Sequence, residues 1–195
     1  AIAVGAIALF LPLIRADLGI TFSQAGLLAA VATLSYALMQ IPAGLIADRV
    51  SPKLLFGVGV AGANALAIVF ALTNDFAIMV AAQAIAGVFR ALMFIPGMVL
   101  ITRHFSERRR ATALGLFVAG GFSSNILISL VGPLLVGPLG WAGVIVWSSV
   151  LGLVVVAAFW WLGDDGSHRE PEVAAPTRWL WRTPAWWLLG LVQFA

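Results

Sequence analysis

The chain has 195 residues, of which 62% are apolar and 10% are charged. This charged content is far below the roughly 25% of soluble domains. Together with a mean hydropathy of +1.06, it indicates an integral membrane protein. The absence of cysteine excludes a disulfide framework and a thiolate metal site.

Seven apolar runs predict transmembrane helices, because about 20 residues are needed to cross roughly 30 Å of hydrocarbon. Five of the runs are long enough to be complete: 25–47, 54–73, 76–101, 112–136 and 142–162. The runs at 1–14 and 184–195 are shorter, and we interpret both as parts of longer helices, since the first begins without Met and the last stops at Ala195. No basic segment precedes the first run, so we expect no cleavable signal peptide.

These spans predict an all-α membrane protein with three parts. Residues 1–162 form a bundle of six transmembrane helices, residues 163–183 form a central linker, and residues 184–195 begin a seventh helix. The linker is rich in Asp, Glu, Gly, Ser and Pro, which predicts a flexible, solvated segment. The tryptophans near the seventh run are typical of an interfacial belt, with an aromatic ligand box as the alternative. They are Trp179, Trp181, Trp186 and Trp187.

Basic residues are concentrated in alternate loops, which predicts the orientation of the chain. Nine of the eleven Lys and Arg residues lie in the loops at 48–53, 102–111 and 163–183. The other loops hold only Arg15. The positive-inside rule therefore places the three basic loops in the cytoplasm and the chain in the cell (inner) membrane. The predicted outward loops contain Asp17, Asn74, Asp75 and residues 137–140. Topology thus explains the net charge of +3, and we expect the lipid bilayer rather than nucleic acid as partner.

Arg90 lies about midway between Asp75 and Arg103, so roughly 20 Å of helix separates it from either end, too far for its side chain to snorkel. An Arg near the midplane costs about 2.5 to 3.5 kcal/mol on insertion scales and should face protein, water or a counter-charge. No Asp or Glu lies in any predicted span. Its acceptor is therefore a substrate anion, a carboxylate outside this chain, or backbone carbonyls.

A guanidinium suits carboxylates and phosphates, because it binds two oxygens at once and stays charged at physiological pH. Arg90 therefore favours an anionic substrate. The structural alternative is that Arg90 clamps neighbouring helices by bonding carbonyls exposed near Pro96 or Gly97.

Polar and small residues at helical spacing form stripes on three spans. The first stripe is Gln83, Gly87, Arg90, Phe94 and Gly97, the second is Thr33, Tyr36, Gln40 and Gly44, and the third is Asn125, Ser129 and Gly132. Together they predict a hydrated cavity. Its substrate-contacting residues would be Arg90, Gln83, Phe94, Tyr36, Gln40 and Asn125. The alternative for every member except Arg90 is helix-to-helix packing, which uses the same residue types in membranes. Asn64 stands alone and is assigned to packing.

Other functional classes lack the residues that they need. An intramembrane Ser-His dyad is unavailable because His104 and His168 fall in predicted loops, and without clustered carboxylates these histidines make no metal site. No Gly-rich phosphate loop supports ATP-driven transport. We therefore expect no metal, no cofactor and no enzymatic activity.

A short polar cassette, Gly44 to Lys53, separates the second and third spans. It resembles the loop between helices two and three of the major facilitator superfamily, whose pattern is Gly, three residues, Asp-Arg, a turn residue and basic residues. The small residue, Asp48, Arg49 and Lys53 match, whereas Ser51 and Pro52 replace the more common Gly and Arg. The segments 105–111 and 140–141 resemble the loop after helix four and the start of helix six. Gly132-Pro133 is similar to an antiporter motif of helix five, although Ile128 replaces its earlier Gly.

The resemblance implies half of a twelve-helix fold, with the six helices arranged as 3+3 inverted repeats and a missing carboxyl-terminal six-helix half as partner. It further implies that Asp48 helps to hold the two halves together on the cytoplasmic side. The implied gate residues are Gly44, Asp48, Arg49, Lys53 and Arg103, with the three basic residues as possible partners of the carboxylate.

These observations predict a secondary transporter that works by alternating access and moves a small organic anion. An exporter of hydrophobic or drug-like compounds, with Arg90 in a structural role, is the alternative within transport. A membrane scaffold or enzyme is the alternative outside it.

Overall fold

The computed structural model describes residues 2–162, which form five helical elements joined by short turns. They are α1 (Ile2–Leu18), α2 (Phe22–Ala47), α3 (Pro52–Leu72), α4 (Phe76–His104) and α5 (Glu107–Leu162). The all-α prediction is confirmed for this part of the chain. The predicted linker at 163–183 and the seventh span at 184–195, with its tryptophans, lie outside the described residues.

The helices begin at residues that satisfy their free N–H groups. Thr21 and Gln24 form a capping box at the start of α2, in which the Thr21 hydroxyl accepts from the Gln24 N–H at 3.2 Å and the Thr21 N–H donates to Gln24 Oε1 at 2.8 Å. Ser51 caps α3, and Pro52 occupies its first position, where no N–H is needed. The Asp75 carboxylate accepts from two backbone N–H groups of α4, at 2.7 and 3.1 Å.

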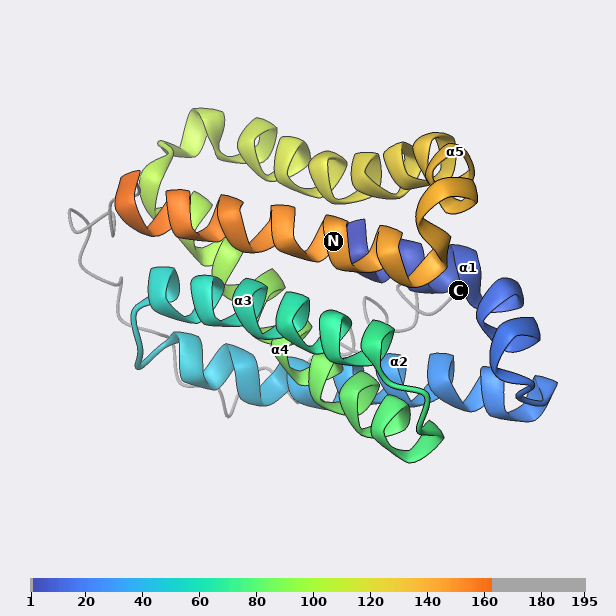
Figure 1. The fold of residues 1–195 in the computed structure, drawn as a ribbon. Coiled ribbons are helices and arrows are strands. Elements are labelled where there is room, and N and C mark those ends of the chain that lie inside the picture. Colours follow the sequence, from blue (N-terminus) through green and yellow to red (C-terminus); the bar gives the residue numbers. More distant parts are fainter. Residues whose placement is uncertain (1, 163–195) are drawn as a thin grey trace.

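Helix α5 contains two predicted spans in one continuous element. Gly140 is its one residue with non-helical dihedrals, at φ 67° and ψ 169°, and such a positive φ favours glycine. The chain therefore reverses direction there, and Figure 1 shows the two parts of α5 running side by side. We call the part before Gly140 the first arm and the part after it the second arm. The predicted runs 112–136 and 142–162 correspond to these arms.

The connections lie at alternate ends of the bundle. In Figure 1 the α2–α3 and α4–α5 connections and the end of α5 lie on the left, whereas the α1–α2 and α3–α4 connections and the bend of α5 lie on the right. The basic connections of the sequence therefore share one end. By length and composition, α2, α3, α4 and α5 are each able to cross a membrane, and α1 has 17 residues.

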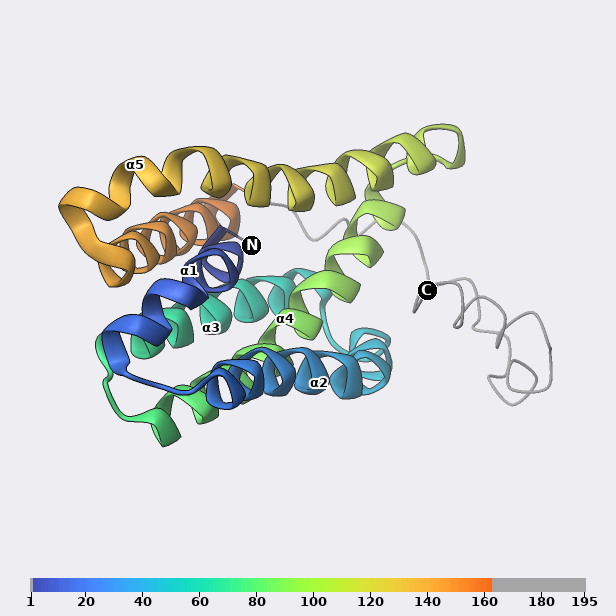
Figure 2. The ribbon, with the colours of Figure 1, turned by 90° about the vertical axis from the view of Figure 1, so that its right-hand side faces the viewer.

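The packing pairs repeat within the bundle. Helix α4 packs against α2 and α3, α1 packs against both arms of α5, and α3 packs against the second arm. The bundle can be divided into α1, α2 and α3 on one hand and α4, the first arm and the second arm on the other. If these two sets are exchanged in that order, each pair of packed helices becomes another packed pair. In Figure 2 α1 lies below α5 and above α2, and α4 rises from beneath α2 to its connection with α5. The arrangement agrees with the expected fold of two three-helix units.

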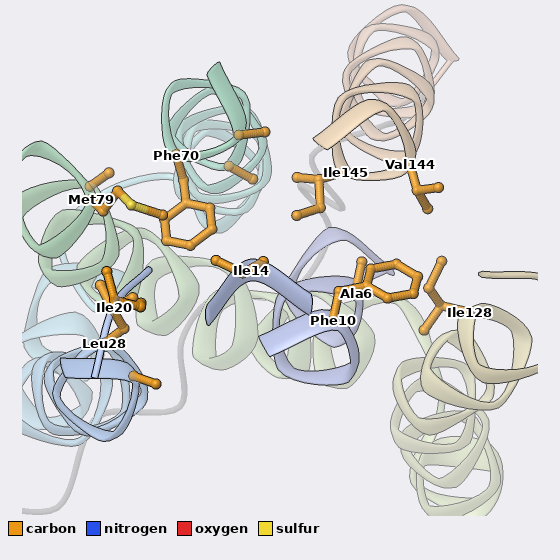
Figure 3. Packing of buried hydrophobic residues seen from close by; sticks show 14 residues of the cluster. Ala6, Phe10, Ile14, Ile20, Leu28, Phe70, Met79, Ile128, Val144 and Ile145 are labelled. Atoms are coloured by element: carbon orange, nitrogen blue, oxygen red, sulfur yellow. The ribbon is translucent and has the colours of Figure 1, made fainter. Parts of the chain in front are cut away.

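A hydrophobic core joins these units near the bend of α5. Figure 3 shows Ile14 of α1 between Phe70 of α3 and Ile145 of the second arm, with Met79 of α4 beside Phe70. All four side chains are buried. By contrast, α2 and the first arm of α5 expose many large apolar side chains, such as Leu38. An exposed apolar surface is expected where a helix meets lipid or another apolar bundle.

The loops are shorter than predicted. Only Phe105 and Ser106 separate α4 from α5, so Arg103 and His104 lie in the last turn of α4 rather than in a loop over 102–111. Arg15 and Asp17 belong to the last turn of α1. Hydropathy identifies only the residues that cross the hydrocarbon core of the membrane. A helix can extend beyond them until its terminal N–H and carbonyl groups are capped.

The same correction applies to the remaining connections. Lys53, predicted in the cassette loop, lies in the first turn of α3. Residues 137–139, predicted as part of an outward loop, are helical, so that the connection is reduced to Gly140. The actual turns are therefore tighter than the polarity of the sequence suggested.

Candidate functional site

Helices α2 and α4 approach each other closely at Gly87. A Cβ added at Gly87 would lie 2.6 Å from the Ala32 carbonyl oxygen, 2.8 Å from Ser35 Cβ and 2.9 Å from the Tyr36 nitrogen. Only glycine permits this approach, because two of the three atoms belong to the backbone of α2. Gly87, predicted as part of a polar stripe, thus acts as the contact point that brings the stripes of α2 and α4 together.

Arg90 lies one turn beyond this crossing and is half-buried. Its Nε donates to the Ala86 carbonyl of its own helix at 3.4 Å, and its Nη2 donates to the Ala32 carbonyl of α2 at 3.2 Å. The structure thus places Arg90 on backbone carbonyls, as the structural alternative required. These carbonyls belong to Ala86 and Ala32, however, and not to the region of Pro96 and Gly97.

The hydrogen bonds of Arg90 leave donor capacity unused. A guanidinium has five N–H groups, and within residues 2–162 two carbonyls accept from them. In the same part of the chain no carboxylate pairs with Arg90. The two carbonyl bonds hold the guanidinium in place without neutralising its charge.

Tyr36 lies on α2 beside Arg90, and Gln40 follows Tyr36 one turn later on the same face of α2. The Tyr36 hydroxyl is close enough to the Gln40 side chain and to the guanidinium to interact with both. All three side chains are partly exposed. We call this group, Arg90 with Tyr36 and Gln40, the Arg90 site. It brings together three of the six residues predicted to contact substrate.

Phe94 limits the Arg90 site on the side of the α4–α5 connection. Its ring lies 5.9 Å from the ring of Phe117 in the first arm of α5, measured between centroids, with planes tilted by 35°. Phe117 also lies against Gly97, where an added Cβ would be 2.7 Å from Phe117 Cζ. Phe94 therefore faces an aromatic neighbour one turn from the guanidinium.

The other two predicted residues lie apart from this group. Gln83 is buried on α4, two turns before Arg90. Asn125 lies on the first arm of α5, where its side chain contacts Gly5 of α1. Asn64, assigned to packing, donates to the Val60 carbonyl at 2.8 Å and lies against Gly152 of the second arm. Helical spacing assigns residues to faces of single helices but does not say which faces meet.

The predicted gate residues lie at the end of the bundle that holds the basic connections. Asp48 ends α2, and its backbone N–H donates to the Gly44 carbonyl at 3.2 Å. Its carboxylate is exposed and, among residues 2–162, makes no ion pair with Arg49 or Arg103. Of the partners suggested from the sequence, Arg49 and Arg103 therefore do not pair with Asp48 among these residues.

Two features were missed by sequence reasoning. Trp141 Nε1 donates to Asp17 Oδ2 at 2.9 Å, which ties the end of α1 to the start of the second arm. A pocket of about 600 Å³ lies between the end of α4 and the start of α5. Its lining is Ile101, Phe105, Arg109, Thr112, Ala113, Leu116 and Phe117. The only sequence signal for the bond was that Asp17 and Trp141 both stand at predicted outer helix ends.

The described part of the chain contains no cluster of side chains that could bind a metal ion. No group of three or more His, Cys, Asp or Glu side chains able to hold a metal ion occurs within residues 2–162. His104 lies in the last turn of α4 with Nδ1 2.9 Å from the Leu100 carbonyl oxygen. Within residues 2–162, the Arg90 site is a group in which a charged side chain keeps hydrogen-bond donors that no described carboxylate occupies.

Comparison with known proteins supports a transporter family. The family model described as Major Facilitator Superfamily matches residues 1–195. The probable L-galactonate transporter of Escherichia coli strain K12 is 27% identical over 160 residues, which cover 80% of this chain and 35% of that protein. The D-galactonate transporter of Escherichia coli O6:H1 is 26% identical over 144 residues, which cover 72% of this chain and 33% of that protein.

Export proteins are similar to the chain as well. The tetracenomycin C resistance and export protein of Streptomyces glaucescens is 28% identical over 162 residues, which cover 83% of this chain and 30% of that protein. The chain spans about a third of the length of the curated relatives that it matches.

Proposed function

The chain belongs to the major facilitator superfamily, and we propose that it forms the amino-terminal half of a secondary transporter that moves a small organic anion by alternating access. In this mechanism two helix bundles rock about a substrate site near the midplane of the membrane. The observation that carries the proposal is the Arg90 site, in which a positioned guanidinium keeps free donors beside Tyr36 and Gln40.

The chemistry of Arg90 supports a carboxylate as the anchored group. Its carbonyl bonds fix the direction of the guanidinium, so less freedom is lost when a planar anion binds. A carboxylate accepts two parallel N–H groups, and such charge-assisted bonds are about twice as strong as neutral ones. Tyr36 and Gln40 add a hydroxyl and an amide, which suit the hydroxyl groups of a sugar acid.

The relatives support the same class of substrate. Two of them are described as galactonate transporters, and galactonate is a carboxylate with several hydroxyl groups. We therefore propose a hydroxylated monocarboxylate as the substrate class. In this assignment Arg90 binds the carboxylate, and Tyr36 and Gln40 bind hydroxyl groups. Gln83, Phe94 and Asn125 line the remaining path.

An exporter of hydrophobic compounds is the second candidate. Three of the relatives are described by an antibiotic that they transport, export or confer resistance to. The Phe94–Phe117 pair beside the Arg90 site supplies an aromatic surface that such a compound needs. In this case Arg90 would hold α2 against α4 through the Ala32 carbonyl and would not select a charge.

The orientation follows from the shared end of the basic connections. We propose that this end faces the cytoplasm and that the chain lies in the inner membrane, because basic residues near the ends of helices are retained inside. Asp48 then stands exposed at the cytoplasmic surface, free of an ion pair within residues 2–162. It is placed to pair with the second six-helix half when the cytoplasmic side is closed, with Gly44, Arg49, Lys53 and Arg103 around it.

Uptake of labelled galactonate into proteoliposomes that contain the full-length protein tests the proposal. We expect wild-type protein to accumulate galactonate, and Arg90→Gln to reduce uptake by at least about thirtyfold, since losing one partner of a buried charged pair costs about 2 kcal/mol or more. Arg15→Gln is the matched control, because Arg15 lies in the last turn of α1, away from the midplane, over the ring of Phe22. Equal uptake by the folded Arg90→Gln protein and wild type would exclude the anchor and favour the exporter.

A further inference from the structure

The pocket between α4 and the first arm of α5 combines an apolar lining with a basic rim formed by Arg109. Figure 2 shows α4 and α5 diverging from their short connection, and the pocket lies in this corner. Its apolar part comes from Ile101, Phe105, Leu116 and Phe117, and Arg109 stands at its edge. Its volume of about 600 Å³ is within the range of ligand sites.

The charge at this corner is positive and uncompensated. Arg103, Arg108 and Arg109 lie within a short stretch of chain, and none of them forms an ion pair with another described residue. The Nε–H of Arg110 is buried and has no acceptor in residues 2–162. Glu107 is the one acidic residue among them. The corner therefore complements an anion.

The pocket also lies at the depth of lipid headgroups. Ile101 is eleven residues from Arg90, or about 16 Å along α4. Half of the hydrocarbon thickness is about 15 Å. If Arg90 marks the midplane, as the proposed function requires, the pocket spans the boundary between acyl chains and headgroups.

An exposed apolar stripe continues from the pocket along α5. Residues Arg109, Ala113, Leu116, Gly120, Leu127 and Leu130 recur at helical steps on one face, and each of them except half-buried Ala113 is exposed. Ser123 lies on the same face, but its hydroxyl donates to the Ala119 carbonyl at 2.8 Å and so needs no water. From Leu116 to Leu130 the stripe is about 21 Å long, which is close to the length of an extended acyl chain.

We propose that this corner is a binding site for an anionic phospholipid of the cytoplasmic leaflet. The phosphate binds the Arg109 guanidinium of the rim, the glycerol region fills the pocket, and one acyl chain follows the stripe on α5. A soluble anion would use the rim but not the apolar stripe, and a neutral lipid would use the stripe but not the rim. Basic pockets between transmembrane helices on the cytoplasmic side commonly bind such headgroups. The inference rests on the proposed orientation.

Native mass spectrometry of the purified full-length protein tests the lipid site. Phosphatidylglycerol is the anionic probe, and diacylglycerol with the same acyl chains, which lacks the phosphate, is the neutral probe. We expect wild-type protein to bind phosphatidylglycerol more tightly, and Arg109→Gln to weaken that binding by about fivefold while leaving diacylglycerol binding unchanged. Arg15→Gln removes the same charge at the opposite end and should have no effect. Equal losses for the two variants would overturn the proposal.

The apolar part of the site has its own pair of variants. Leu116 and Leu38 are both exposed, at 70% and 68%, but only Leu116 lines the pocket. Leu116→Trp should fill the pocket and weaken phosphatidylglycerol binding, whereas Leu38→Trp should not. Unchanged binding to Leu116→Trp would contradict the proposal. The proposal would also be contradicted if phosphatidylglycerol bound only after Asp164→Asn and Asp165→Asn, because the acidic linker rather than a lipid would then occupy the pocket in wild-type protein. Galactonate takes no part in these measurements, so their failure would be separate from a failure of the Arg90 anchor.

Discussion

The close crossing of α2 and α4 predicts a specific cost for adding one methyl group at Gly87. The Cβ of Gly87→Ala would lie 2.6 Å from the Ala32 carbonyl oxygen, so the helices must separate by about 0.8 Å to reach an ordinary contact of 3.4 Å. The bond from Arg90 Nη2 to the same carbonyl is already 3.2 Å long and would exceed hydrogen-bonding distance. Overpacking of this kind costs about 1 to 3 kcal/mol.

Thermal unfolding and ligand binding of the full-length protein measure both consequences. Gly26→Ala is the matched control, because Gly26 lies in α2, the helix that Gly87 contacts, but an added Cβ there would have nothing within 4 Å. We expect Gly87→Ala to lower the unfolding temperature and weaken galactonate binding, and Gly26→Ala to change neither by more than about 0.5 kcal/mol. If the two alanine variants behave alike, α2 and α4 do not cross as closely as described and the Ala32 carbonyl does not position Arg90.

Three further predictions concern other parts of the bundle. Trp141→Phe removes the hydrogen bond to Asp17 and should lower the free energy of unfolding, measured by chemical denaturation, by about 0.5 to 1.5 kcal/mol. The same substitution in an Asp17→Ala background should cost much less. Equal costs in the two backgrounds would show that the bond is not formed. Asp75→Ala should lose about 1 kcal/mol by removing the cap of α4, while Asp75→Asn should retain most of it, as circular dichroism melts would show. Asp48→Asn should increase the labelling of cysteines introduced on the cytoplasmic face of the full-length protein, without changing galactonate affinity within either state. If the labelling of both faces is the same in Asp48→Asn and in wild type, the gate role is excluded.

The six helices were predictable from the sequence because the hydrocarbon imposes their length. Twenty apolar residues with polar residues at each end leave few alternatives for a segment such as 54–73, and α3 occupies Pro52–Leu72. The helix ends were less predictable. Caps such as Thr21 and Asp75 set them within the interfacial region, where hydropathy no longer distinguishes helix from loop.

The Arg90 site was predictable in part. The cost of an intramembrane charge singled out Arg90, and helical spacing placed Tyr36 and Gln40 on one face of α2. Which faces meet depends on close approaches between helices, and Gly87 sets this one. Asn125 was assigned to the same cavity because it shares a helical stripe with Ser129 and Gly132, whereas its side chain contacts Gly5 of α1. The pocket beside Arg109 combines residues of two helices, and no single segment of sequence shows it.

The central claim is that Arg90 selects a negative charge. Equilibrium binding of galactonate and of the neutral sugar galactose to the full-length protein, with Arg90 present and with Arg90→Gln, tests it most directly. We predict that wild-type protein prefers galactonate by at least about thirtyfold and that Arg90→Gln abolishes this preference. A preference of the same size in both proteins, or no preference in wild type, would contradict the account.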